Sequence, residues 1–193
     1  MNAPTQHALR AGAIAAACGA LAALLAACGS LSTPPENFYT LSVETPAPNA
    51  PPSAASAPQV TVEVSLNEMV DRPQLVVRTG PNRVVILEQQ RWGEPLKEAI
   101  ARVVAADLRR VVAGANGETL HVALDVRRFE SLPGDAVEIE AAWRAARGKS
   151  GEINGVATIR EPARGAGYDA LAAAHSRGLA KVSEQIAAAI ATR

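Results

Sequence analysis

The chain has 193 residues with 19 basic and 19 acidic side chains, and 48% of its residues are hydrophobic. The near-neutral charge argues against nucleic acid as a partner, because such a partner needs a basic face. The length suits one domain with a real core. Since only 3% of the residues are aromatic, alanine and the branched aliphatic residues must fill that core.

Residues 1–27 are predicted to be a lipoprotein signal peptide. A short segment that contains Arg10 and no acidic residue precedes an apolar, alanine-rich run, which is typical of export signals. The run ends in Leu25-Ala26-Ala27-Cys28, which has the spacing of a lipobox: a large aliphatic residue, two small residues and a thiol. Diacylglycerol on the Cys28 thiol and an acyl chain on its freed amine would anchor the protein, at about 0.8 kcal/mol per buried CH2.

Two alternatives for this segment stay open, an ordinary cleaved signal with an Ala-x-Ala site and a retained membrane helix. The run from Ala11 to Ala27 is short for a membrane span, and alanine is a weak membrane residue. Cys18 has Ala15 where a lipobox needs a large aliphatic residue, so we place Cys18 in the discarded segment. Cys28 is then the only cysteine of the mature chain, and no disulfide is expected.

Residues 28–37 are predicted to be a lipidated tether, rich in serine and proline. Gly29 follows the lipidated cysteine. An aspartate at this position favours retention in the inner membrane in Gram-negative sorting, so its absence favours the periplasmic face of the outer membrane.

Residues 38–193 are predicted to form one domain. Residues 38–43 are β-prone and suit a first strand, whereas residues 45–58 are rich in proline and alanine and are expected to form a mobile loop. A loop of this length is unusual inside a domain. An alternative is therefore that the compact domain begins at Gln59 and that the first strand is an addition to it.

The next segments predict strands followed by a helix. Residues 59–66 alternate between apolar and polar side chains, which indicates a half-buried strand. The Asp71-Arg72-Pro73 turn leads into a hairpin of residues 75–78 and 83–88. Trp92-Gly93-Glu94-Pro95 then opens a helix, whose apolar residues recur at three- and four-residue steps up to Val112.

A three-stranded meander and a second helix complete the domain. The strands alternate with a period of two, and turns are predicted at residues 131–135 and 147–151. The second helix begins near Tyr168 and includes His175 in its apolar stripe. The predicted fold class is α+β, a largely antiparallel sheet with two helices packed on one face.

The sequence offers no constellation for catalysis or metal binding. No His or Cys pair has metal-ligand spacing, and no nucleophile elbow is present. We interpret His121 as an outward strand residue, His175 as structural, and Glu138 and Glu140 as part of a solvated sheet face. The sequence therefore predicts a protein that is not an enzyme and carries no cofactor other than its acyl chains.

Three stretches resemble those of the ABC-type transport auxiliary lipoprotein family. They are Phe38-Tyr39-Thr40-Leu41, Asp71-Arg72-Pro73-Gln74-Leu75-Val76-Val77-Arg78 and Arg91-Trp92-Gly93-Glu94-Pro95-Leu96. With the lipobox, their order covers essentially the whole mature chain. The chain departs from the family at Asn67-Glu68-Met69-Val70, where a Pro and a Tyr-Leu pair are common, and at Gly93, where Ala is usual.

The resemblance implies a non-catalytic accessory of a transport system that moves lipids between membranes. Such systems pair an ABC-type or permease component with a periplasm-spanning MCE-domain protein, which this lipoprotein would dock. Asp71, Arg72, Arg91 and Trp92 are the predicted partner contacts. The alternatives are a turn with a surface ion pair for Asp71 and Arg72, and a core anchor at the helix entry for Trp92.

Two other functions are alternatives to this one. A structural lipoprotein of outer-membrane assembly would use the same anchor, but its partner would be a barrel protein. A lipid-active hydrolase is disfavoured because no nucleophile–base pair is recognisable. A homo-oligomer is compatible with the sequence.

Overall fold

The computed structural model describes residues 34–43, 59–112, 118–148 and 151–192. The predicted lipobox at Leu25-Ala26-Ala27-Cys28 and the predicted loop at residues 45–58 lie outside the described residues. The chain divides into two compact units, Met1–Pro35 and Glu36–Arg193. The fold reported below is that of the second unit.

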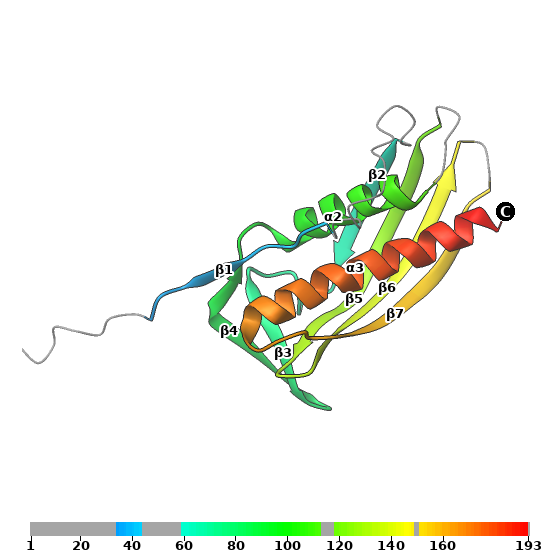
Figure 1. Cartoon of the computed structure of the whole chain (residues 1–193). Helices are drawn as coiled ribbons and strands as arrows, with labels where there is room; N and C mark the ends of the chain where they lie inside the picture. The colour runs from blue at the N-terminus through cyan, green and yellow to red at the C-terminus, as the bar shows by residue number, and fades with distance from the viewer. Residues whose placement is uncertain (1–33, 44–58, 113–117, 149–150, 193) are drawn as a thin grey trace, which may run out of the picture. The chain divides into compact units, whose positions relative to one another are not determined.

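Seven strands form one sheet in the order β1-β4-β3-β5-β6-β7, and β2 also pairs with β5 (Figure 1). The pairs β3–β4, β5–β6 and β6–β7 are antiparallel, whereas β1–β4, β2–β5 and β3–β5 are parallel. The predicted α+β class is confirmed, with a mixed and mostly antiparallel sheet. The strands are β1 Asn37–Tyr39, β2 Val60–Leu66, β3 Gln74–Gly80, β4 Arg83–Trp92, β5 Leu120–Leu132, β6 Ala136–Arg147 and β7 Ile153–Pro162.

One edge of the long strand β5 is shared by β2 and β3 in succession. The β2 strand pairs with β5 from Leu120 to Val126, and β3 pairs with it at Ser131. Between them, the Asn67 N–H still donates to the Val126 carbonyl, at 3.0 Å. Residues 67–73 are therefore a loop that connects β2 to β3, and these two strands pair with consecutive parts of β5.

Two helices, α2 (Leu96–Val111) and α3 (Gly167–Ala191), lie side by side on one face of the sheet (Figure 1). The α2 helix packs on β2, and α3 packs on β6 and β7. Gly178 brings α3 close to β6, because a Cβ at this position would lie 2.6 Å from Ile139 Cδ1. Neither helix is long and apolar enough to cross a bilayer, and this statement covers the described residues only.

The core lies between the helices and the sheet. The alternating apolar residues of β5, from Leu120 to Val126, are buried there, as the sequence predicts. His175 is also buried in this core and His121 is exposed, as expected. Side chains that anchor the core from the two helices and the meander include Leu96, Ile100, Val103, Leu108, Phe129, Ile139, Leu179, Val182 and Ile186.

Several predicted boundaries are wrong, and all involve strand pairing. The turn predicted at residues 131–135 is shorter, because Ser131 and Leu132 belong to β5 and pair with β6. The first strand covers Asn37–Tyr39 and not residues 38–43, because its ladder with β4 ends at Tyr39. The β4 strand continues to Trp92 instead of ending at Glu88, because it is paired with β1 on one side and with Gln74 on the other. The helix therefore begins only at Leu96, after Pro95.

Candidate functional site

The three stretches singled out in the sequence meet at one corner of the sheet. The end of β4 lies between β1 and the beginning of β3, with Arg91 paired to Phe38 on one side and to Gln74 on the other. The Trp92 N–H donates to the Pro73 carbonyl at 2.7 Å, and the Gly93 N–H donates to the Tyr39 carbonyl at 2.8 Å. Backbone hydrogen bonds thus hold these distant segments in one place.

A shallow hollow of about 400 Å³ lies at this place. We call it the motif corner. It brings together all four residues predicted to contact a partner. Its lining residues are Phe38, Asp71, Arg72, Pro73, Arg91, Trp92, Gly93, Glu94, Pro95 and Leu96.

Ion pairs fix the charged side chains of the motif corner. The Arg91 Nη1 atom lies 2.7 Å from Glu36 Oε1, and Lys97 Nζ lies 3.7 Å from Asp71 Oδ2. Both pairs are partly exposed to solvent, so each contributes little to stability, about 0–1 kcal/mol. They leave the corner with charges of both signs at its rim.

Arg72 supports the turn on which it lies. Its Nε atom donates to the Met69 carbonyl at 2.7 Å, and its Nη2 atom donates to the Glu68 carbonyl at 3.2 Å. The guanidinium therefore stabilises the conformation of the loop between β2 and β3. Arg72 thus stabilises the predicted turn and also lines the hollow.

Phe38 and Trp92 have opposite positions at this corner. Phe38 is 61% exposed, so much of its ring is in contact with solvent. Trp92 is 6% exposed, and its ring centroid lies 5.9 Å from that of Phe129 and 5.5 Å from that of His175. Trp92 therefore supports the hollow from inside, while Phe38 presents an apolar surface to solvent.

Sequence reasoning missed several members of the motif corner. Glu36 and Lys97 were not singled out, although each pairs with a predicted contact residue. Phe38 lies in one of the three family-like stretches, but it was not predicted to contact a partner. No local signal separates these residues from ordinary surface positions, because their importance arises from segments that are distant in sequence.

A buried Ser–His pair lies behind Trp92. The Ser131 Oγ and His175 Nε2 atoms are 3.0 Å apart, and both residues are at most 1% exposed. Burial lowers the pKa of His175 to about 3. Because the pair is sealed in the core and His175 Nδ1 has no hydrogen-bond partner within the described ranges, a substrate cannot reach it and no acid orients the ring.

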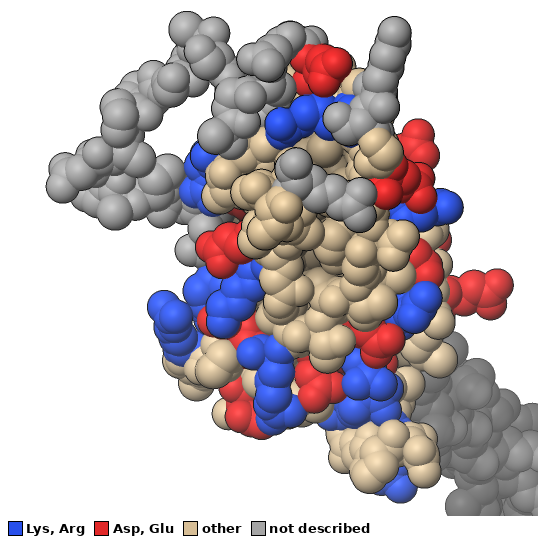
Figure 2. All heavy atoms as spheres, turned by 90° about the vertical axis from the view of Figure 1, so that its right-hand side faces the viewer, with Lys and Arg blue, Asp and Glu red and all other residues tan. Residues whose placement is uncertain are grey.

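The face of the sheet opposite the helices carries an ion-pair network. Arg78 binds both carboxylate oxygens of Glu130, with Nε–Oε2 at 2.5 Å and Nη2–Oε1 at 2.8 Å. Glu138 pairs with Arg128 at 3.2 Å and with Arg160 at 2.9 Å, so it lies on a partly solvated sheet face as expected. Figure 2 shows a side of the molecule on which charges of both signs surround an uncharged centre.

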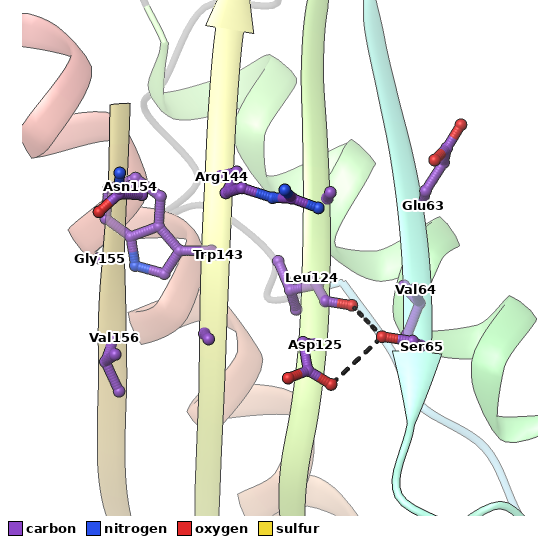
Figure 3. A pocket seen from close by; sticks show the side chains of 12 residues that line it. Glu63, Val64, Ser65, Leu124, Asp125, Trp143, Arg144, Asn154, Gly155 and Val156 are labelled. Carbon is purple, nitrogen blue, oxygen red and sulfur yellow. Dashed lines mark hydrogen bonds between the residues drawn. The ribbon is translucent and has the colours of Figure 1, made fainter. Parts of the chain in front are cut away.

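A hollow of about 560 Å³ crosses this open face over β2, β5, β6 and β7 (Figure 3). Ala123 and Ala142 keep its floor low. Arg144 extends from β6 across β5, and the Ser65 hydroxyl donates to Asp125 Oδ1 at 3.3 Å. In the part of the chain that the structure describes, no three His, Cys, Asp or Glu side chains are grouped to hold a metal ion.

The structure predicts that Gly155→Ala destabilises the meander. A Cβ at Gly155 would lie 2.5 Å from Cζ2 and 2.8 Å from Cε2 of the Trp143 ring, which extends from β6 to β7 (Figure 3). The rigid indole must move, so we expect a loss of about 1–3 kcal/mol in the free energy of unfolding, measured by urea denaturation. Gly151→Ala is the control, because nothing lies within 4 Å of its Cβ position. Equal stability of the two variants would contradict this packing.

The comparisons with known proteins agree with this fold. A crystal structure of an uncharacterized protein matches with a TM-score of 0.64 and 20% identity, over 81% of this chain and 99% of that chain. The crystal structure of protein XCC0632 from Xanthomonas campestris, assigned to DUF330, matches with a TM-score of 0.59 and 22% identity, over 78% and 92%. At these identities the likeness shows the fold alone. No curated protein matches the chain.

A family model matches residues 39–187, which include most of the motif corner, all of α2 and most of α3. The match covers well over half of the chain. On this evidence the chain belongs to the family of ABC-type transport auxiliary lipoprotein components.

Proposed function

We propose that this protein is a non-catalytic, lipid-anchored accessory of an ABC/MCE-type system that moves lipids between membranes. In this proposal the motif corner docks the periplasm-spanning MCE-domain protein. The observation that carries it is the convergence of Asp71, Arg72 and Arg91, from segments distant in sequence, around one hollow beside the exposed Phe38. Membership of a transport auxiliary family supports the transport role.

The chemistry of the motif corner suits a protein interface. Interfaces combine an apolar centre with a polar rim, and aromatic and arginine side chains are enriched in them. Phe38 supplies an exposed aromatic ring, and Arg91 and Arg72 supply guanidinium groups next to it. Since Trp92 fixes the backbone below, the surface is already ordered before a partner binds, which lowers the entropic cost of docking.

The proposed anchor keeps the motif corner near a membrane. In this proposal Cys28 carries diacylglycerol and an N-acyl chain, and Gly29 directs the protein to the periplasmic face of the outer membrane. The chain from Cys28 to Phe38 can extend by at most about 3.3–3.6 Å per residue, which limits its reach to roughly 35 Å. A partner that spans the periplasm would therefore contact the motif corner with the end of the partner that lies near the outer membrane.

Site-specific photocrosslinking in intact cells tests the proposal. A photoreactive phenylalanine analogue at Phe38 or Arg72 is expected to crosslink to the MCE-domain protein. The matched control is the same analogue at Val156, which is 58% exposed on the open face of the sheet and is expected to give no such product. Cys28→Ala is expected to remove the protein from the membrane fraction, because the protein loses its anchor. The crosslinks from the motif corner are expected to be lost with it.

Two results would contradict the proposal. Crosslinks to an outer-membrane barrel protein instead of the MCE-domain protein would support the structural assembly lipoprotein. If the Cys28→Ala variant stayed in the membrane fraction as the unsubstituted protein does, the result would contradict the lipid anchor.

A further inference from the structure

The β7 strand, Ile153–Pro162, forms the edge of the sheet that lies opposite β1 in the strand order (Figure 1). Within the described part of the chain it pairs with β6 alone. Its ladder with β6 is regular along the whole strand, whereas the β3–β4 and β5–β6 ladders contain register shifts. A long, regular edge strand is a template for a further strand unless something covers or interrupts it.

The hydrogen bonds of β7 show which of its backbone groups point away from the sheet. The Ala163 N–H donates to the Asp135 carbonyl at 2.8 Å, in register with the β6–β7 ladder. Because every second residue of an antiparallel strand bonds to a given neighbour, the odd-numbered residues of β7 bond to β6. The even-numbered residues therefore direct their N–H and C=O groups to the free edge. Pro162 agrees with this phase, since its carbonyl accepts from Arg177 Nη2 of α3 at 2.8 Å.

The middle of this edge is open. Among the described residues, Pro162 is the only even-numbered position of β7 whose outward backbone group has a hydrogen-bond partner. Asn154, Val156 and Thr158 are exposed, and Val156 is more exposed than any other described Val, Leu, Ile or Met side chain. Residues 153–159 contain no charged side chain, although charges are a usual means of keeping a second strand away from an edge.

The edge is complementary to a second copy of itself. Two β7 strands that run antiparallel about a twofold axis at Val156 would place the two Val156 residues opposite each other. Asn154 of each copy would then lie opposite Thr158 of the other. All three positions are even-numbered, so each opposed pair can exchange two backbone hydrogen bonds. The side chains match as well, because an apolar pair at the centre has a polar pair on either side.

Charges at the two ends of the edge fit the same arrangement. Glu152 directly precedes β7 and lines a hollow of the open sheet face, and it would lie opposite Arg160 of the second copy. Arg160 pairs with Asp135 and Glu138 of its own chain, and its side chain is still 54% exposed. The arrangement therefore brings opposite charges together once on each side of the axis.

We propose that β7 pairs antiparallel with β7 of a second copy of this chain, so that the two sheets join into one. The interface is isologous, with its twofold axis at Val156, and it closes as a dimer. The motif corner lies on β1 and β4, at the other end of the strand order, so the pairing leaves it accessible. The pairing does not rest on the function proposed for the motif corner.

Disulfide trapping of the full chain in intact cells tests the proposal. Opposed residues of a hydrogen-bonded pair have Cα atoms about 5.5 Å apart, which suits a disulfide. Val156→Cys is therefore expected to give a disulfide-linked dimer on a non-reducing gel after mild oxidation. Thr158→Cys is the matched control, since its two copies would be offset by roughly 13 Å along the strands. We expect at least about tenfold less dimer from it, because the offset exceeds the reach of a disulfide. The unsubstituted chain controls for Cys18 and Cys28.

A backbone substitution tests the hydrogen bonds of the interface. In the Val156→Cys chain, Asn154→Pro removes an outward N–H and no bond to β6, a change that edge strands tolerate. It is expected to lower the yield of dimer several-fold, whereas Asn154→Ser keeps the N–H and is expected to keep the yield. If protease resistance shows that the proline variant does not fold, the comparison of Val156 with Thr158 decides the result.

Three results would each overturn the proposal. The first is the absence of a dimer from Val156→Cys, or its trapping to another protein and not to itself. The second is an equal yield from Thr158→Cys, which would indicate another register or random collisions. The third is an unchanged yield in a folded Asn154→Pro variant, because the outward N–H would then take no part in the contact.

Discussion

Replacing Trp92 with alanine is expected to lower the free energy of unfolding by about 3–5 kcal/mol, the usual cost of truncating a large buried aromatic residue. The Trp92 ring is 6% exposed and packs against Phe129 and His175. Its removal leaves a cavity below the motif corner, where β4 ends and α2 begins. Chemical denaturation followed by far-UV circular dichroism measures the loss directly.

The neighbouring residue provides the control for this variant. Arg91 belongs to the same predicted set of contact residues, but its side chain is partly exposed and pairs with Glu36 at the surface. Arg91→Ala is therefore expected to cost less than about 1 kcal/mol. If Trp92→Ala were as stable as Arg91→Ala, Trp92 would not be a core anchor, and its role would have to lie at the surface.

Acidification from pH 7 to pH 5 is expected to destabilise the protein through His175. Burial lowers the pKa of His175 to about 3 in the folded state, against 6.5 for the ordinary side chain. Below pH 6.5 the unfolded chain binds a proton that the folded chain does not, so the free energy of unfolding falls as the pH falls. Above pH 6.5 His175 is neutral in both states and its burial lowers stability little. At pH 5 the free energy of unfolding is lower by about 2 kcal/mol.

Two histidine variants separate this effect from other acid effects. His175→Gln is expected to remove most of the slope between pH 7 and pH 5, whereas exposed His121→Gln is expected to keep it. Burial raises the pKa of Glu161, but the bonds with Lys181 and Arg177 more than offset this, and its pKa lies below 4.5. The stability that Glu161 contributes is thus lost only at lower pH. A slope that survives in His175→Gln would refute the assignment.

Local patterns in the sequence were sufficient to predict most elements and the fold class. The alternation in β2 and β5 identifies which side chains are buried, because successive residues of a strand point to opposite faces. The three- and four-residue spacing after Pro95 identifies the buried stripe of α2 for the corresponding reason. The motif residues Asp71, Arg72 and Arg91 were also recognisable, since they lie in short stretches typical of one family.

Only the tertiary structure decided which strands pair and how deep each side chain lies. Alternation specifies the face of a strand but not its neighbour, so the parallel pairing of β2 with β5 and the extension of β4 to Trp92 could not be inferred. The same reason explains why Trp92 and Phe38, both in recognisable motifs, have opposite exposures.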